Sequence, residues 1–386
     1  MKIALVSPYD FAYPGGVTNH ISYLERHFTR LGHDVRIIAP ASRAVSNLGD
    51  RFIPIGTPRP VPASGSIARI TISPWLSSRV SRVLARENFD IIHLHEPLMP
   101  MLCTTVLRLA NAPTVGTFHA SGTRSWYNYS PVANLILRRW FRRLDGRITV
   151  SELATERVAK YFPGCYHVIP NGVDLEHFSP NAAPLGQFSD GKLNILFVGR
   201  LEKRKGLDYL LKAYKLIKPE FPACRLIVVG PGNRLRRKYE KQVKKSGLAD
   251  VIFAGYVSND DLPRYYQTAD IFCAPATGWE SFGIILLEAM AMGKAIVASN
   301  VEGYARLVSD NVDGLLVPPR DEQALGRALL TLLKDKSLRT KIGAQGRLKA
   351  SEYAWEDIAR RVLDYYATVL NESPLKKESS SGTVLV

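Results

Sequence analysis

Strand-type and helix-type segments alternate along this chain, and the alternation runs through twice. In the first half, Val17, Ile21, Leu24 and Phe28 have helical spacing between two apolar strand-type segments. Strand-type segments cover residues 2–6, 34–39, 90–95, 114–118, 147–150 and 166–174, and, after a break, 192–199, 224–230, 251–255, 271–275 and 295–299. Because helices usually join parallel strands, the pattern predicts two α/β domains facing each other across a cleft.

The break between the two halves predicts the domain boundary. Residues 179–191 contain two prolines, two glycines and small polar residues, a composition typical of a linker. We therefore expect a first domain over 1–178 and a second over 191–352. Residues 353–372 contain a long terminal helix, and the lysine- and serine-rich residues 373–386 are expected to be a disordered tail.

Charge and cysteine content limit the possible partners. The 386 residues include 51 Lys and Arg against 35 Asp and Glu, a net charge of +16. That excess favours nucleic acid, an anionic membrane surface or a phosphorylated substrate, without selecting one. The four cysteines form no C-x-x-C pair, which gives no indication of a zinc site or a disulfide framework. The apolar run at the N-terminus is short for a signal peptide, and no run approaches ~20 residues, so we expect a cytoplasmic protein that meets membranes only at their surface.

Two glutamates eight positions apart, Glu280 and Glu288, stand out in the second half. Glu280 opens a glycine-containing turn, whereas Glu288 lies in an apolar helix-type stretch over residues 284–292. Carboxylates are rarely buried without a partner. Glu288 therefore either lies on an exposed stripe of an amphipathic helix or forms part of a site.

Two cations follow a strand-type segment of the same half. Arg200 and Lys205 come after residues 192–199, and ligands of open α/β sheets bind at such carboxyl ends. There they could stabilise a diphosphate, although a solvated basic loop would look the same. Gly15 and Gly16, between a strand and a helix, indicate either an anion-binding helix N-terminus or a tight turn. G-x-G-x-x-G and P-loop motifs are absent from the sequence.

Histidines follow two strand-type segments of the first half. His119 comes directly after residues 114–118, where it could contact a substrate or be structural. His93, His95 and Glu96 suggest a metal set, but no further ligands are spaced to complete it. The sequence also lacks D-x-D, a motif of metal-chelated nucleotide diphosphates. We expect no metal.

An amphipathic segment carries three arginines on one face. Leu76, Val80, Val83 and Leu84 share the opposite face, and a second basic and aromatic cluster covers residues 137–143. Such segments can lie on anionic lipid, or can turn an apolar stripe to the core and a charged face to water. The arginines expected to meet an anionic lipid surface are Arg79, Arg82 and Arg86.

Taken together, these motifs resemble one enzyme family. The matching segments are residues 14–17 (PGGV), 93–97 (HLHEP), 117–119 (TFH), 170–174 (PNGVD), 199–206 (GRLEKRKG) and 280–289 (ESFGIILLEA). In this order they resemble the retaining GT-B glycosyltransferases of family 4. Within that family the chain is most similar to the actinobacterial phosphatidylinositol mannosyltransferases, which also share residues 65–69 (GSIAR).

The resemblance implies a fold, a reaction and roles for particular residues. It implies two Rossmann-like domains, with the C-terminal helix crossing back to the first, and a nucleotide-sugar donor held mainly by the second. Gly16 would face the diphosphate, Glu288 the ribose, and Ser281, Phe282 and Gly283 would complete the donor motif. The residues implied to act in catalysis are His119, Arg200, Lys205 and Glu280. No tightly bound cofactor and no essential metal are implied.

The acceptor side departs from the family pattern. The resemblance places the acceptor near Tyr9, Thr18, Arg69 and Arg124. Thr18 and Arg124 replace the mannosyltransferases' Gln and Lys, and Leu98 replaces an Asn on the inositol side. Loss of polar groups there leaves the acceptor open.

The expected reaction moves a hexose, mannose from GDP-mannose, to a membrane lipid such as phosphatidylinositol at the inner face of the cell membrane. The alternative is a UDP-sugar donor with another lipid, a soluble or a polysaccharide acceptor. A nucleic-acid-binding module has only the +16 charge in its favour. We therefore expect no specific nucleic-acid partner.

Overall fold

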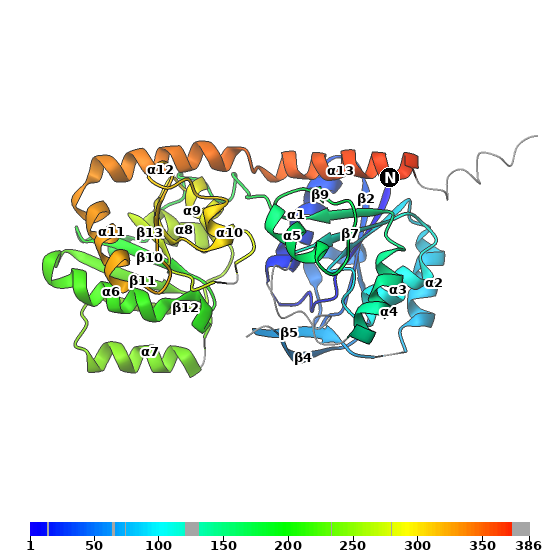
Figure 1. Cartoon of the computed structure of the whole chain (residues 1–386), viewed down its shortest axis with the longest axis horizontal. Helices are drawn as coiled ribbons and strands as arrows, with labels where there is room; N and C mark the ends of the chain where they lie inside the picture. The colour runs from blue at the N-terminus through cyan, green and yellow to red at the C-terminus, as the bar shows by residue number, and fades with distance from the viewer. Residues whose placement is uncertain are drawn as a thin grey trace, which may run out of the picture. The chain divides into compact units, whose positions relative to one another are not determined.

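The chain forms two compact α/β units (Figure 1). The computed structural model describes residues 1–13, 15–63, 66–73, 75–119, 131–232, 234–278 and 280–372. One unit comprises Met1–Asn171 with Trp355–Val386, and the other comprises Gly172–Ala354. Arg124 and the tail 373–386, both named in the sequence analysis, lie outside the described residues.

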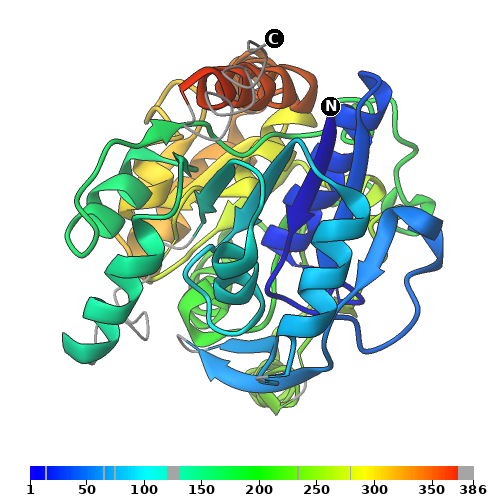
Figure 2. The same ribbon diagram turned by 90° about the vertical axis from the view of Figure 1, so that its right-hand side faces the viewer.

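A seven-stranded parallel sheet forms the centre of the first unit (Figure 2). Ile3 and Leu5 of its strand β1 face one apolar layer, and Ala4 and Val6 face the other. Both faces are therefore covered, as parallel sheets require. In spatial order the strands are β3 (Phe52–Pro54), β2 (Asp34–Ala39), β1 (Lys2–Val6), β6 (Ile91–His95), β7 (Thr114–Phe118), β8 (Gly146–Thr149) and β9 (His167–Val168).

Helices cover both faces of this sheet. On one face, α1 (Gly16–Arg30) packs beside α13 (Trp355–Glu372), which brings the end of the described chain back to its beginning. The predicted return of the C-terminal helix to the first domain is thus confirmed. The other face is covered by α2 (Ser77–Glu87), α3 (Leu102–Leu109) and α4 (Pro131–Phe141). The unit also contains α5 (Glu152–Ala159), the 3-10 helix η1 (Ser46–Arg51) and an antiparallel hairpin of β4 (Pro58–Ala63) and β5 (Ser66–Thr71).

The second unit has the same design around a six-stranded parallel sheet. Its strands, in spatial order, are β12 (Val251–Gly255), β11 (Cys224–Val229), β10 (Leu193–Val198), β13 (Ile271–Ala274), β14 (Ala295–Ser299) and β15 (Leu315–Val317). Its helices are α6 (Leu207–Glu220), α7 (Arg234–Lys245), α8 (Leu262–Thr268), α9 (Ile284–Ala291), α10 (Glu302–Ala305), α11 (Glu322–Lys334) and α12 (Lys336–Ser351), with 3-10 turns η3 (Gly186–Phe188) and η4 (Lys203–Lys205). Two parallel Rossmann-like sheets confirm the predicted fold class.

The segment predicted as a linker packs on the second unit. Phe188, inside this segment, and Phe178, just before it, are buried in that unit's core, and Phe178 meets the ring of Tyr266 edge to face. The guanidinium of Arg225 lies over the ring of Phe188 at 5.1 Å. The burial of these two aromatic rings anchors the segment on the second unit, although its proline and glycine content is typical of a loop. Along the chain, the second unit accordingly begins at Gly172, upstream of the expected boundary.

Candidate functional site

A carboxylate held by two cations marks the carboxyl ends of the strands in the second unit. The Oε1 atom of Glu280 accepts a hydrogen bond from Nη1 of Arg204 at 2.8 Å. The same oxygen lies 2.8 Å from Nζ of Lys205. Its side chain is only 11% exposed. Lys205 ends η4, just after β10, and Glu280 lies in the turn between β13 and α9. The structure therefore brings the predicted pair Lys205 and Glu280 into direct contact.

A second carboxylate extends this contact into a network. Nε of Arg204 donates to Oε2 of Glu202 at 2.8 Å, and Nη2 of Arg200 lies 3.2 Å from the other oxygen of Glu202. Three cations and two carboxylates leave one excess positive charge, which suits an anionic ligand. Sequence reasoning missed Arg204 and Glu202 because both lie inside a basic run that could equally be a solvated loop.

Backbone contacts hold the two halves of this network together. The amide of Thr277 donates to the carbonyl of Arg204 at 2.8 Å. Gly206, which ends the basic turn, has φ 75°, and a Cβ there would lie 1.7 Å from the carbonyl oxygen of Pro275. Only glycine permits this approach, so the residue after Lys205 fixes the turn against the segment leading to Glu280.

Glu288 lies within α9 and is bound by a buried tyrosine. The hydroxyl of Tyr266 donates to its Oε2 atom at 2.7 Å. Burial raises the pKa of Glu288 to about 7, although the hydrogen bond from Tyr266 acts in the opposite direction. Glu288 is itself partly buried. Because it is also bound by Tyr266, which is fully buried, it does not lie on an exposed stripe.

The three residues after Glu280 form the entry to α9. Gly283 is the N-cap of that helix, with φ 108°. The ring of Phe282 meets Tyr353 at a centroid distance of 5.9 Å, and Ser281 lies in the turn before it. The donor motif predicted from the sequence is therefore one continuous turn and helix start.

A histidine cluster occupies the corresponding strand ends of the first unit. His119, directly after β7, donates its backbone N–H to Oε1 of Glu96 at 2.9 Å. Its Nε2 atom lies 2.9 Å from Nδ1 of His95 in a hydrogen bond. The ring of His20, from α1, meets His119 and His95 at centroid distances of 4.7 and 5.3 Å. Nδ1 of His20 in turn donates to Oδ1 of Asn171 at 2.9 Å.

Burial keeps these imidazoles uncharged. It lowers the pKa of His20 to about 4 and holds the pKa values of His95 and His119 well below their ordinary value. His20 and Asn171 were not predicted as site residues. A signal was present, because Asn171 lies in the PNGVD motif and His20 is four residues past Gly16.

His93 has a different environment from its neighbours. Its two ring nitrogens hydrogen-bond the hydroxyls of Tyr366 and Thr117, both at 2.6 Å. Burial lowers its pKa to about 3. His93 thereby joins α13 to the sheet, which makes it a structural residue and not a partner of Glu96 in a ligand set.

The predicted donor residue Gly16 and the predicted acceptor residues Tyr9, Thr18 and Arg69 all lie in the first unit. Gly16 is the first residue of α1, and the Thr18 hydroxyl donates to the carbonyl of Gly15 at 3.0 Å. Tyr9 pairs with Ile70 beside the hairpin. The Arg69 guanidinium lies 4.2 Å from the ring centre of Tyr13, and the Asp10 amide donates to the carbonyl of Arg69. Tyr9 and Arg69 are thus brought to one edge of the hairpin.

Leu98 does not line a polar site in this chain. Its side chain is 3% exposed and packs in the apolar layer that contains Leu94 and Leu102. The replacement of the mannosyltransferases' Asn by Leu98 therefore places an apolar side chain in the core of the first unit.

The amphipathic segment of the sequence forms α2, and its apolar stripe faces the core. Leu76, Val80 and Leu84 are all buried against the sheet. The three arginines lie at the surface, where Nη2 of Arg79 donates to the carbonyl of Pro54 at 3.1 Å. Trp75, just before the helix, is 85% exposed. Among the described helices, none is long and apolar enough to cross a membrane.

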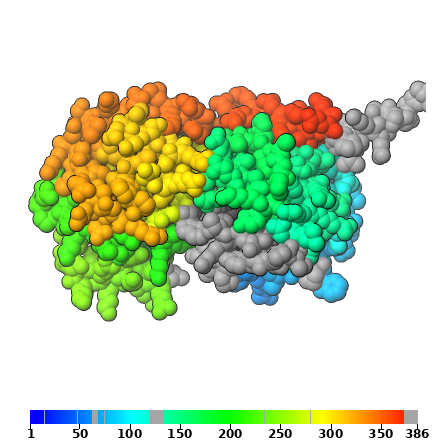
Figure 3. All heavy atoms as spheres, viewed as in Figure 1, coloured from blue at the N-terminus to red at the C-terminus, as the bar shows by residue number. Residues whose placement is uncertain are grey.

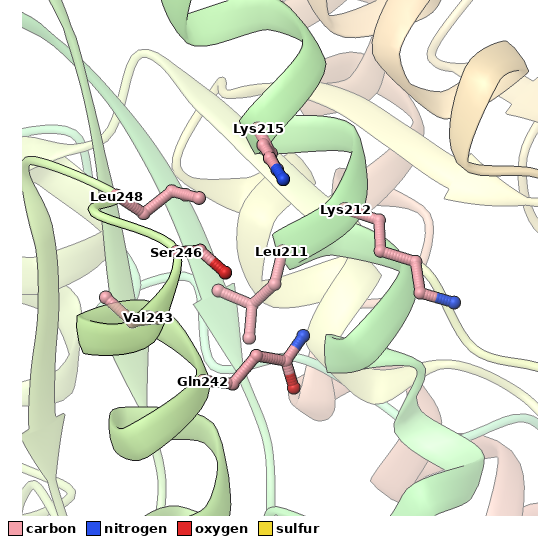
Figure 4. Close-up of a pocket in the computed structure, with 7 residues that line it drawn as sticks. All are labelled: Leu211, Lys212, Lys215, Gln242, Val243, Ser246 and Leu248. Atoms are coloured by element: carbon pink, nitrogen blue, oxygen red, sulfur yellow. The ribbon is translucent and has the colours of Figure 1, made fainter.

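A surface pocket lies between α6 and α7 of the second unit (Figure 4). It is lined by Leu211, Lys212, Lys215, Gln242, Val243, Ser246 and Leu248. Neither a carboxylate nor an imidazole lines it, and none of its residues belongs to the network around Glu280. Figure 3 shows α7 at the surface of its unit, in light green. The pocket therefore contains none of the predicted site residues.

Both halves of the chain match family profiles of glycosyltransferases, in line with its two parallel-sheet units. Residues 14–177 match the family profile described as Glycosyltransferase Family 4, and residues 184–349 match that of Glycosyl transferases group 1. The chain therefore belongs to family 4 of the glycosyltransferases and is an enzyme of that class.

Relatives named as mannosyltransferases align over nearly the whole chain. The phosphatidyl-myo-inositol mannosyltransferase of Mycobacterium leprae is 38% identical over 96% of this chain and 97% of its own. The phosphatidyl-myo-inositol mannosyltransferase of Propionibacterium freudenreichii is 33% identical over 95% of this chain and 94% of its own. The GDP-mannose-dependent alpha-(1-6)-phosphatidylinositol monomannoside mannosyltransferase of Mycobacterium tuberculosis is 28% identical, over 76% and 79%.

Solved structures share the fold at low identity. HepE of Anabaena, in complex with UDP and glucose, superposes with a TM-score of 0.76 at 21% identity over 95% of this chain and 99% of its own. Sucrose-phosphate synthase of Thermosynechococcus elongatus superposes with a TM-score of 0.75 at 22% identity, over 96% of this chain and 100% of its own.

Proposed function

We propose that this glycosyltransferase transfers mannose from GDP-mannose to a phosphatidylinositol-type lipid, with retention of the anomeric configuration. The observation that carries the proposal is the network of Glu280 with Arg204 and Lys205 at the strand ends of the second unit. The names of relatives that align over nearly the whole chain support the choice of mannose and of the lipid.

The network supplies what a nucleotide-sugar donor needs. Arg200 and Lys205 would neutralise the diphosphate, both bound and as it leaves, which lowers the barrier where negative charge develops. Among the described residues, the hydrogen bonds to Glu280 use its Oε1 atom. Its Oε2 atom would accept from hydroxyls of the transferred sugar.

Glu288 would bind the other end of the donor. Its carboxylate would accept from the two ribose hydroxyls, next to the Tyr266 hydroxyl. Ionisation of Glu288 above about pH 7 would strengthen these hydrogen bonds, because charged acceptors bind more tightly than neutral ones.

In the first unit, His119 would contact the donor sugar near its reacting carbon. Glu96 and His95 hold this residue through its backbone amide and its ring. Gly16, at the start of α1, would face the diphosphate, where helix amides favour an anion. The leaving phosphate would accept the proton of the acceptor hydroxyl on the same face of the sugar.

The basic surface of α2 supports a membrane-lipid acceptor. Arg79, Arg82 and Arg86 on α2 would bind anionic lipid electrostatically, with Trp75 at the level of the headgroups. Because the apolar stripe of α2 is in the core, binding would be peripheral and salt-sensitive. The enzyme would act at the inner face of the cell membrane.

Two measurements test the donor and the acceptor separately. First, thermal unfolding is followed with GDP and with UDP, and we expect stabilisation by GDP alone. Second, the protein is incubated with radiolabelled GDP-mannose and with UDP-sugars, in the presence of phosphatidylinositol vesicles or soluble polyols. Transfer from a UDP-sugar, or transfer only to soluble acceptors, would refute the corresponding half of the proposal.

A further inference from the structure

Three histidine rings from separate segments converge on one point within the first unit. His20 belongs to α1, His95 ends β6 and His119 follows β7. One ring nitrogen of each lies within 4.8 Å of the other two. Such convergence of neutral nitrogen donors is typical of transition-metal sites.

His20 is oriented as metal-binding histidines usually are. Its Nδ1–H donates to the carbonyl oxygen of the Asn171 side chain at 2.9 Å. A neutral imidazole with its proton on Nδ1 carries a lone pair on Nε2. In metal sites, the nitrogen away from the ion commonly donates to such a carbonyl, which fixes the tautomer of the ring.

His95 carries a nitrogen that the surrounding protein does not satisfy. The residue is fully buried, and its Nδ1 bonds His119. Among the described residues, its Nε2 has no hydrogen-bond partner. A buried polar atom without a partner is uncommon and calls for a physical reason. A ligand received by this cluster is such a reason.

The neighbouring residues define the limits of the set. His93 is excluded as a ligand because Tyr366 and Thr117 occupy both of its ring nitrogens. Glu96, bonded to the backbone of His119, supplies a negative charge beside the cluster. His119 is half-buried, whereas His20 and His95 are buried, so an ion would enter past His119.

We propose that His20, His95 and His119 bind a divalent transition-metal ion of the zinc class, with water in the fourth position. Zinc takes nitrogen ligands at about 2.0–2.1 Å in a tetrahedron, so the rings would turn inward around the ion. An all-imidazole set favours zinc, cobalt or nickel over magnesium, which prefers oxygen ligands.

A bound ion would also act on the reaction, a consequence that rests on the proposed function. Because the metal would hold the ring of His119, that ring would no longer be available to the donor sugar. Zinc would therefore inhibit transfer, and removal of zinc by a chelator would restore it.

The test titrates the full-length, chelator-treated protein with Co²⁺ and records its visible absorption, and then displaces cobalt with Zn²⁺ or with Mg²⁺. We expect a four-coordinate cobalt spectrum that saturates at one ion per chain and disappears with zinc but not with magnesium. His20→Gln and His119→Gln should weaken cobalt binding at least about tenfold, and Asn171→Ala about 10- to 100-fold. His27→Gln, on the same helix as His20, is the matched control and should bind normally.

Three outcomes would overturn the metal site. They are unchanged cobalt binding in His20→Gln and His119→Gln, an equal loss of binding in His27→Gln, and the absence of saturable cobalt binding. Circular dichroism of each variant verifies that it is folded, and His119→Gln, at the half-buried position, keeps the test valid if the buried variant unfolds. The spectrum needs no transferase activity. One zinc ion bound without loss of activity would leave the site standing and refute the role of His119 at the donor sugar.

Discussion

At the scale of single residues, Glu280 joins Arg204 and Lys205, two cations from another loop. In the proposed function, this arrangement holds the charges that a diphosphate would meet. Preorganised charges of this kind need no rearrangement during the reaction. The predicted positions Arg200, Lys205 and Glu280 do lie in one network, to which Arg204 and Glu202 must be added.

Replacement of Glu280 by glutamine should remove most of the activity. The amide keeps the shape of the side chain but no longer compensates Arg204 and Lys205. We expect kcat/KM for sugar transfer to fall by about 10²–10³, as for loss of one electrostatic group in other enzymes. Glu240→Gln, at an exposed ion pair on α7, should be unaffected. Wild-type turnover in Glu280→Gln would contradict the role assigned to this carboxylate.

Glu288 should make stability depend on pH in the neutral range. Its folded-state pKa of about 7 is above the ordinary 4.5, so the protonated form is favoured in the folded protein. The stability gained from this difference is fully present below pH 4.5 and is lost as pH rises through 7, up to about 3 kcal/mol. Glu288→Gln should therefore raise the melting temperature at pH 8 more than at pH 5.

Thermal unfolding at the two pH values measures this difference, with Glu356→Gln, an exposed position on α13, as the control. An equal shift at both pH values would show that Glu288 is not buried as described.

Sequence patterns located part of the charged network, but neither the charged residues that complete it nor the residues that position it. Lys205 and Glu280 are visible because a strand end and a glycine turn surround them. Arg204 was hidden in a basic run, and the signal for Asn171 was only its place in the PNGVD motif. His20 contacts His95 and His119, which lie at the ends of β6 and β7, far away in the sequence.

At the scale of elements, a short helix fixes the turn that carries Glu280. Gly303 of α10 approaches that turn so closely that a Cβ would lie 2.1 Å from the Glu280 carbonyl oxygen. An added methyl group would have to displace backbone, which a well-packed interior resists. The position of Glu280 therefore depends on an element that contributes no charge to the site.

Gly303→Ala should reduce activity through this displacement. We expect about 1–3 kcal/mol of destabilisation and a fall in kcat/KM, because the carboxylate would leave Arg204 and Lys205. Gly186→Ala is a matched control in the same unit, since a Cβ there would meet nothing within 4 Å. Denaturant unfolding and steady-state kinetics check both variants. Identical behaviour of the two would mean that the contact of α10 with the turn is unimportant.

Long apolar strands were predictable, whereas short or proline-containing ones were not. β1, β2, β7, β12 and β14 have the limits expected from the sequence. β3 and β15 have three residues each, too few for a pattern, and the prolines of β4 conceal its pairing with β5. Residues 179–191 were misassigned because their turn-forming composition outweighed the burial of Phe188.

At the scale of the whole molecule, the first unit is built from both ends of the described chain. α13 covers the sheet that residues 1–171 form, and Tyr366 bonds His93 in the middle of it. Tyr366, Ile358 and Val362 are buried in the same layer as Ile21 and Phe28. The last helix is therefore part of a core and not an appendage.

Tyr366→Phe should destabilise the first unit. Loss of the hydroxyl leaves Nδ1 of the buried His93 without its partner, which costs about 1–3 kcal/mol. Tyr256→Phe, at an exposed position in the second unit, should have little effect. Urea unfolding followed by circular dichroism compares them. Equal midpoints would show that the hydrogen bond between Tyr366 and His93 adds nothing to stability.

The return of α13 also sets an order of events during synthesis on the ribosome. Residues 172–354 hold all strands of the second sheet and emerge before α13 does. The first sheet, although translated earlier, must wait for residues 355–372 before the face that α1 covers in part is fully covered. The unit made second can thus complete its core first, while the nascent N-terminal sheet keeps apolar surface exposed and open to chaperones until translation is nearly finished.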